Sequence, residues 1–292
     1  MNNDTTLTAN REYKSSIFEM VFSEKENLLE LYNAINGTNY DDPDLLEINT
    51  LKNAIYMSMH NDVSFIIDSQ LSLYEHQSTV NPNLPLRYLM YVSDLYSSLT
   101  INENLYGTKA IKLPTPKFII FYNGDKKQPD SQILKLSDMY KIPITNPELE
   151  LQALMLNINP GHNQTLLNAC KTLSDYSTFT SKVRSYASTM NTNQAVELAI
   201  NECIKNDILA DFLLKNKAEA IKMSIYEYDA EKHIRMERED AKADGIMEER
   251  VRSIKSLMDS LSMSAEQAMA ALKILPEEYS EYLSLLKIDS KS

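Results

Sequence analysis

The sequence predicts an α/β fold in which a sheet-forming first part is followed by an almost wholly helical second part. Two runs rich in β-branched and aromatic residues, 61–77 and 117–122, are typical of strands. Between them, residues 85–99 repeat apolar side chains at helical spacing behind a proline that suits a first helical turn. Beyond Gln164 the apolar spacing is helical almost throughout. We therefore expect a layered α/β core over residues 10–160 with a mostly helical C-terminal region.

The stretch before the first strand run predicts two helices. Apolar residues recur at helical intervals from about residue 12 to residue 36, and Ser23 followed by Glu26 is a capping-box pattern that suggests a new start there. Gly37 is expected to end the second helix. Two short apolar runs are candidates for the first strand: 45–50 and 54–59.

The strand at 117–122 is expected to stop at Asn123-Gly124-Asp125, which is turn chemistry. Residues 133–139 and 149–158 are candidates for further strands before the break at Pro160-Gly161. We expect three regions: a core over 10–160, a helical region over 161–258, and a small helical unit over 259–292.

In the helical region, residues 208–254 predict one long, highly charged helix. A solvated or coiled helix is the simpler interpretation, and a DNA-gripping arm is the alternative. The last unit is expected to start near Ser264. Either of the C-terminal helical regions offers a route to a homo-oligomer.

The run 61–77 is the most informative part of the chain because it is typical of a β-hairpin that carries carboxylates on both strands. Asp62 stands at the start of the first strand and Glu75 late in the second. Between the strands, Asp68-Ser69-Gln70 supplies turn chemistry. In such a hairpin the length of the turn decides which side chains share a face of the sheet.

A two-residue turn at 68–69 places Asp62 directly opposite Glu75, whereas a turn one residue later places it opposite Gln77. Opposed residues share a sheet face, as do residues two apart on one strand. Either turn therefore gathers all three side chains on one face, close enough to share a hard dication such as Mg²⁺. A three-residue turn instead pairs Asp62 with His76 and separates the carboxylates. The simpler interpretation of the hairpin is a half-buried sheet whose carboxylates face water and bind no metal.

The metal-binding signature of the PD-(D/E)XK nuclease fold is an Asp and a later Glu-x-Lys, separated by roughly the length of a β-hairpin. This chain resembles it in Asp62 and Glu75-His76-Gln77, with glutamine in the lysine position. The wider sequence is similar to the Rpn family of recombination-promoting nucleases, often called PD-(D/E)XK family transposases, over about residues 10–250. The motifs that carry this resemblance are Glu75-His76-Gln77-Ser78-Thr79, Asn81 to Tyr88, Phe121-Tyr122-Asn123-Gly124 and Lys14 to Phe22.

The resemblance implies a Mg²⁺-dependent DNA endonuclease linked to recombination or transposition, with Mn²⁺ as a possible substitute. It implies that Asp62 and Glu75 are metal ligands, that the backbone carbonyl of His76 is a third ligand, and that Gln77 fills the third catalytic position. A lysine there would add positive charge, whereas Gln77 orients water or a phosphate oxygen through hydrogen bonds alone. The His76 ring is expected on the opposite face of its strand.

Three further residues are candidates for an accessory role. Folds of this kind often use an acidic residue from the first helix, and both Glu12 and Glu19 qualify. Arg87, in the first turn of the helix at 85–99, is placed either to approach a phosphate or to form a surface salt bridge.

The formal charge of −12 opposes simple electrostatic binding of DNA, where a basic footprint is usual. The alternative function is therefore a catalytically weak or inactive nuclease-fold protein that acts as a DNA- or protein-binding module. No Cys/His cluster suggests zinc, and five glycines form no phosphate loop. Two cysteines without metal-ligand spacing suit the reducing cytoplasm. The sequence has no run of eighteen apolar residues, so we expect no membrane span.

Overall fold

The structure, a computed structural model, describes residues 16–49 and 62–289. The chain divides into two compact units, one up to Asp229 and one from Ala230 onward. No helix in the described ranges combines the length and the apolar composition that crossing a bilayer demands.

The first unit is built on a mixed sheet whose described strands lie in the order β1-β2-β3-β4-β6-β5. β1, β2 and β3 form an antiparallel meander, β3, β4 and β6 run parallel, and β5 is antiparallel to β6. The strands are β1 (Glu47–Ile48), β2 (Val63–Ile67), β3 (Gln70–Gln77), β4 (Thr115–Tyr122), β5 (Ser131–Lys135) and β6 (Gln152–Asn157).

Helices precede, interrupt and follow the sheet in the sequence. Single turns of 3₁₀ helix occur at Pro43–Leu45, Leu136–Met139 and Pro276–Glu278. The α-helices are α1 (Ile17–Phe22), α2 (Lys25–Asn36), α3 (Leu84–Leu99), α4 (Gln164–Ala169), α5 (Lys171–Ala187), α6 (Thr192–Lys205), α7 (Ala210–Lys215), α8 (Lys217–Leu261), α9 (Ala265–Ala271) and α10 (Tyr279–Asp289).

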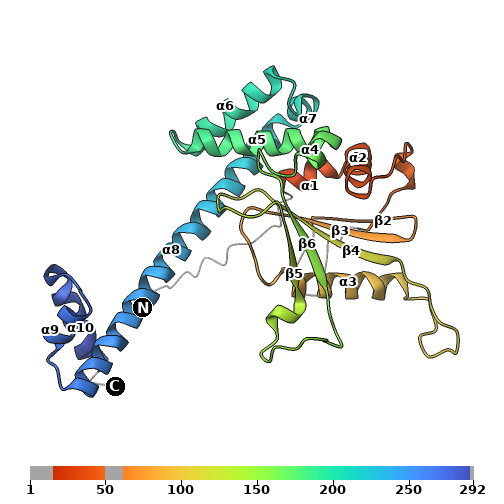
Figure 1. The fold of residues 1–292 in the computed structure, drawn as a ribbon. Helices are drawn as coiled ribbons and strands as arrows, with labels where there is room; N and C mark the ends of the chain where they lie inside the picture. Colours follow the sequence, from red (N-terminus) through yellow and green to blue (C-terminus); the bar gives the residue numbers. More distant parts are fainter. Residues whose placement is uncertain (1–15, 50–61, 290–292) are drawn as a thin grey trace, which may run out of the picture. The chain divides into compact units, whose positions relative to one another are not determined.

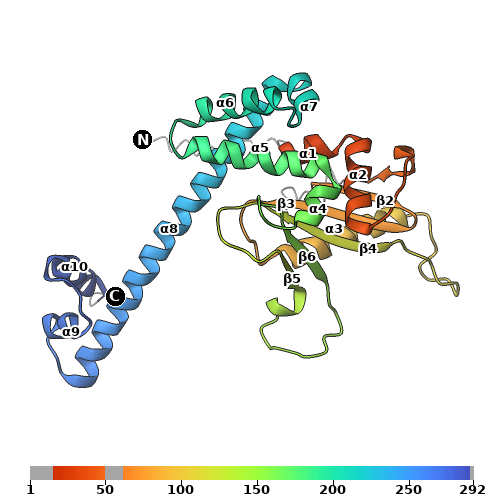
Figure 2. The same ribbon diagram turned by 45° about the horizontal axis from the view of Figure 1, so that its top comes forward.

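The sheet has a helical layer on each face, so the coarse α/β prediction is confirmed. Helix α3 covers one face, while α1, α2, α4 and α5 lie together on the other (Figures 1 and 2). Each face has its own apolar core. Tyr88, Tyr91 and Leu95 of α3 belong to the first core, and Phe18 and Tyr176 belong to the second.

Strand alternation sends neighbouring residues to different cores. Leu71 and Leu73 of β3 belong to the α3-side core, whereas Tyr74 belongs to the core under α1 and α5. Glu75 and Gln77 follow the parity of Leu71 and Leu73. The face that carries them is therefore the one covered by α3.

Most predicted elements are present, with differences at their ends. Gly37 ends α2 in the left-handed conformation (φ 66°), as expected. The predicted capping box at Ser23 is wrong: Glu24 is the N-cap, and the Ser23 hydroxyl donates instead to the Met20 carbonyl at 3.0 Å. The predicted helix over 208–254 is interrupted at Asn216, between α7 and α8. The candidate strand at 54–59 lies outside the described residues.

The division into compact units differs from the predicted boundaries at 160 and 258. Helices α4 to α7 and the first turns of α8 share the core that includes α1, α2 and one face of the sheet. They form a layer of the first unit. The second unit has its own small core, in which Ile254 of α8 packs with Met269 and Tyr282. Ser264 and Gln267 form a capping box at the start of α9.

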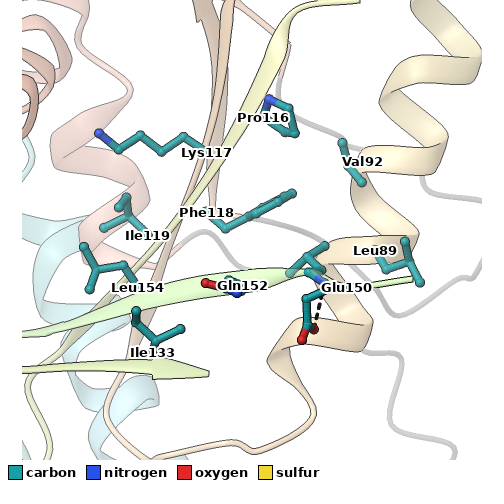
Figure 3. Close-up of a pocket in the computed structure, with 11 residues that line it drawn as sticks. Leu89, Val92, Pro116, Lys117, Phe118, Ile119, Ile133, Glu150, Gln152 and Leu154 are labelled. Carbon is teal, nitrogen blue, oxygen red and sulfur yellow. Dashed lines mark hydrogen bonds between the residues drawn. The ribbon is translucent and has the colours of Figure 1, made fainter. Parts of the chain in front are cut away.

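A groove of about 530 Å³ opens beside α3, where the first residues of β4 have no β6 partner (Figure 3). Phe118, Leu89 and Val92 give it apolar walls. Its charged residues are already engaged: Lys117 donates to Asn36 at 2.6 Å, and Glu150 accepts from Ser137 at 2.6 Å. The groove lies at the amino-terminal end of β4, the opposite end from Gln77 and Tyr122.

Candidate metal and catalytic site

The hairpin turn sets the register on which the site depends. Asp68 and Ser69 both have positive φ, 47° and 61°, which is the backbone of a tight two-residue turn whose twist matches the flanking strands. Ile67 pairs with Gln70, and the ladder continues to Val63 opposite Tyr74. The predicted turn at 68–69 is confirmed.

Continuing this ladder by one residue places Asp62 opposite Glu75. The His76 backbone N–H donates to Asp62 Oδ2 at 2.7 Å, which ties that carboxylate to β3. Gln77 Nε2 donates to Glu75 Oε2 at 3.3 Å, as expected for residues two apart on one face. The structure therefore brings Asp62, Glu75 and Gln77 together. Their binding of a metal stays a prediction.

Arg87 completes the cluster from α3. Its Nη2 lies 3.4 Å from Glu75 Oε1, and the Tyr91 hydroxyl accepts from the same nitrogen at 2.7 Å. Glu75 is only 2% exposed, whereas the Arg87 side chain is 28% exposed. The expected surface salt bridge is instead a half-buried ion pair with a candidate metal ligand, and a phosphate contact of Arg87 stays a prediction.

Both carboxylates are held where their charged forms are disfavoured. Burial raises the pKa of Glu75 above its ordinary value, and the negative charge of Asp62 raises it further, while Arg87 opposes the shift. Burial also raises the pKa of Asp62, against the hydrogen bond from the His76 N–H. The Glu75 side chain is buried and that of Asp62 is half-buried. A dication would relieve the repulsion between these two facing carboxylates.

Glu19 on α1 also acts on this cluster, because its negative charge raises the pKa of Asp62. Of the two acidic candidates near the N-terminus, Glu19 therefore lies near enough to Asp62 for the two carboxylates to repel one another. Glu12 lies outside the described residues. The sequence left this choice open because both residues precede the sheet at helical spacing.

The His76 ring faces the other side of the sheet, as predicted. It stacks on Phe18, and its Nε2 lies 2.8 Å from Asn123 Oδ1. Because Arg184 also donates to that oxygen, at 2.9 Å, Oδ1 is an acceptor and Nε2 carries the proton. Burial lowers the pKa of His76 to about 4, so the ring is neutral near pH 7. This network anchors His76 from behind while its backbone faces Asp62.

Sequence reasoning missed why two motifs far apart in the chain occur together. The Glu75-to-Ser78 motif ends β3 and the Phe121-to-Gly124 motif ends β4, and these parallel strands end side by side. A Cβ at Gly124 would lie 1.7 Å from the Ser78 carbonyl oxygen, so only glycine fits there. The glycine that follows the strand at 117–122 was the signal that could have suggested this close backbone contact.

The cluster offers oxygen ligands of the kind that Mg²⁺ prefers. Within the described ranges, no three His, Cys, Asp or Glu side chains lie close enough together to hold a metal. Asp62 and Glu75 are a pair, which suits Mg²⁺ because it commonly takes one or two carboxylates and keeps several waters. The His76 carbonyl faces the Asp62 side of β3, because the N–H and C=O of one strand residue point the same way.

No protein-family model, curated protein or solved structure matches this chain. Its function is therefore inferred from its residues and their geometry.

Proposed function

We propose that this chain is a Mg²⁺-dependent DNA endonuclease of the PD-(D/E)XK type that serves recombination or transposition. The observation that carries the proposal is the pairing of Asp62 with Glu75 on one sheet face, fixed by the two-residue turn. A buried Glu75 carboxylate that faces the half-buried Asp62 carboxylate is costly in a fold unless a cation or a proton offsets the repulsion.

The order of the elements supports the proposal. Helices α1 and α2 precede the antiparallel strands β1 to β3, and α3 then leads into β4, which is parallel to β3. This order of helix, three strands, helix and strand is the core that the motif resemblance implies. The carboxylates lie toward the end of the sheet at which β3 and β4 finish.

Each residue of the cluster has a role in this proposal. Asp62, Glu75 and the His76 carbonyl would hold Mg²⁺, and the ion would supply positive charge to the phosphate and activate the attacking water. Gln77 orients the attacking water or a phosphate oxygen by hydrogen bonds. Arg87, already beside Glu75, positions a phosphate oxygen and offsets negative charge at the cluster.

Manganese is expected to substitute for magnesium, because both ions accept the same oxygen ligands. A second candidate function is a nuclease-fold protein without cleavage activity that binds DNA or another protein. The observation that favours it is the Arg87 guanidinium, which already supplies Glu75 with a counter-charge. The formal charge of −12 and the glutamine at position 77 agree with this second candidate.

Plasmid cleavage by the full chain, with Mg²⁺, Mn²⁺ or EDTA, separates the two candidates. We expect cleavage with either metal and none with EDTA. Asp62→Asn and Glu75→Gln should abolish cleavage while the fold is retained. Glu47→Gln, which removes an exposed carboxylate from β1 of the same sheet, should cut like the wild type. Wild-type protein that cuts no DNA substrate with either metal would favour the binding module.

A further inference from the structure

The loop that follows β4 starts beside the carboxylate cluster. β3 and β4 are parallel, and Gln77 at the end of β3 pairs with Tyr122 at the end of β4. Residues 123–130, which connect β4 to β5, therefore leave the sheet at the end where Glu75 and Gln77 lie.

Tyr122 directs this loop toward the face that carries the cluster. Paired residues on neighbouring strands share a face, so Tyr122 lies on the same face as Gln77. The Tyr122 hydroxyl donates to the Lys126 carbonyl at 2.8 Å. The backbone at Lys126 is thus held over the α3 face, the one that carries Glu75 and Gln77.

Further contacts hold the loop in place. Asn159 Nδ2 donates to the Gly124 carbonyl at 3.0 Å, and Asn157 Nδ2 donates to the Gln128 carbonyl at 3.0 Å. Gly124 itself packs against the backbone of Ser78, directly after β3. A loop held on both sides of residues 126–127 presents those side chains from a fixed position.

The side chains presented there are two adjacent exposed lysines, Lys126 and Lys127. The neighbouring Asp125 lies 3.7 Å from Arg184 Nε, so its negative charge faces a cation on α5. The other aspartate of the loop, Asp130, lies 2.6 Å from His162 Nδ1. Lys126 and Lys127 are therefore the two adjacent cations of the loop that begins beside the carboxylate cluster, and Arg87 is a third cation, on α3.

We propose that Lys126 and Lys127 bind the phosphate backbone of DNA next to the Asp62–Glu75 pair. The inference rests on the proposed function, since it assigns the substrate contact of the same site. Lysine ammonium groups bind phosphates as point charges, independently of base sequence. A local cationic contact also lets an acidic chain hold DNA in one place while the rest of its surface repels it.

Duplex DNA binding as a function of salt concentration tests this directly, because each lysine–phosphate contact contributes about 0.9 to the slope of log K against log salt. Fluorescence anisotropy of a labelled duplex should be measured in Ca²⁺, a hard dication that takes the same oxygen ligands. The test variant is the double change Lys126→Gln/Lys127→Gln. The charge-matched control is Lys109→Gln/Lys112→Gln, two exposed lysines on the loop that precedes the opposite end of β4.

We expect the test variant to bind more weakly and to lose about two from the salt slope, while the control binds like the wild type. Equal losses in both variants, or none in the test variant, would overturn the inference. Wild-type cleavage without dependence on these lysines overturns this inference alone. Lysine-dependent binding by a protein that never cuts supports it and overturns the endonuclease proposal. A wild type that binds no DNA overturns both.

Discussion

Replacing Arg87 with glutamine is expected to destabilise the protein by an amount that grows with pH. Glu75 is 2% exposed, and Arg87 Nη2 lies 3.4 Å from its Oε1. Because burial raises the pKa of Glu75, the carboxyl is protonated in acid and needs no counter-charge there. Without Arg87 the pKa of Glu75 rises further, so above the wild-type pKa the wild type gains a paired carboxylate that the variant cannot form, and the difference in stability grows with pH.

The magnitude follows from two contributions. Losing the hydrogen bonds from Arg87 to the Tyr91 hydroxyl should cost about 1 kcal/mol at any pH. Raising the pKa of Glu75 above its wild-type value of about 8 adds at most about 1 kcal/mol at pH 8.5, because the carboxyl then keeps its proton instead of forming an unpaired buried charge. We therefore expect a loss of about 1 kcal/mol near pH 5 and about 2 kcal/mol near pH 8.5.

Urea unfolding at both pH values, with and without saturating Mg²⁺, measures this effect. A dication bound to Glu75 replaces the missing positive charge, so Mg²⁺ should restore much of the loss at the higher pH. Lys25→Gln is the control, because it breaks an exposed ion pair with Asp44 and should cost less than about 1 kcal/mol. A loss that does not change with pH would refute the reasoning, and so would one that Mg²⁺ leaves unchanged.

Three other predictions follow from single positions. Gly124→Ala should destabilise the protein by more than about 3 kcal/mol, because its Cβ would lie 1.7 Å from the Ser78 carbonyl oxygen. The control Gly245→Ala lies on α8, where nothing contacts the added Cβ, and should stabilise by up to about 1 kcal/mol in thermal melts. The pKa of His76 is lowered from 6.5 to about 4, so its unfolded state takes up the proton first and stability falls as the pH drops through that window. His76→Gln should remove roughly 2–3 kcal/mol of that pH dependence in urea titrations, and an unchanged pH profile would contradict the buried neutral ring. Gln77→Ala should slow cleavage less than Glu75→Gln does, because Gln77 supplies only neutral hydrogen bonds, and Gln77→Lys should raise the cleavage rate. A larger loss of rate in Gln77→Ala than in Glu75→Gln in single-turnover assays would contradict these roles.

The hairpin was predictable because its register depends on residues close in sequence. The turn residues Asp68 and Ser69 tolerate the left-handed backbone, and the apolar pattern of the strands fixes their faces. That information predicted Asp62 opposite Glu75 for a turn at 68–69, and the structure selects this turn from the alternatives that the sequence left open. Helix ends were less predictable, as Ser23 shows, because competing hydrogen bonds to nearby carbonyls decide them.

The partners of the cluster were not predictable in the same way. The contact of His76 with Asn123 joins residues 47 apart, and it exists because β3 and β4 become parallel neighbours. The pairing of Arg87 with Glu75 depends on how α3 crosses the sheet. Periodicity places each residue on a face of its own element, but the packing of layers decides which faces meet.

Isothermal titration calorimetry of Mn²⁺ binding to the full chain near pH 8 tests most directly whether Asp62 and Glu75 form one metal site. Ligands must lose their protons to bind, so raised carboxyl pKa values predict tighter binding at this pH than near pH 5. We expect one site in the wild type, lost in Asp62→Asn and in Glu75→Gln and kept in Glu47→Gln. Wild-type protein that binds no Mn²⁺, or binding that survives both substitutions, would contradict the account.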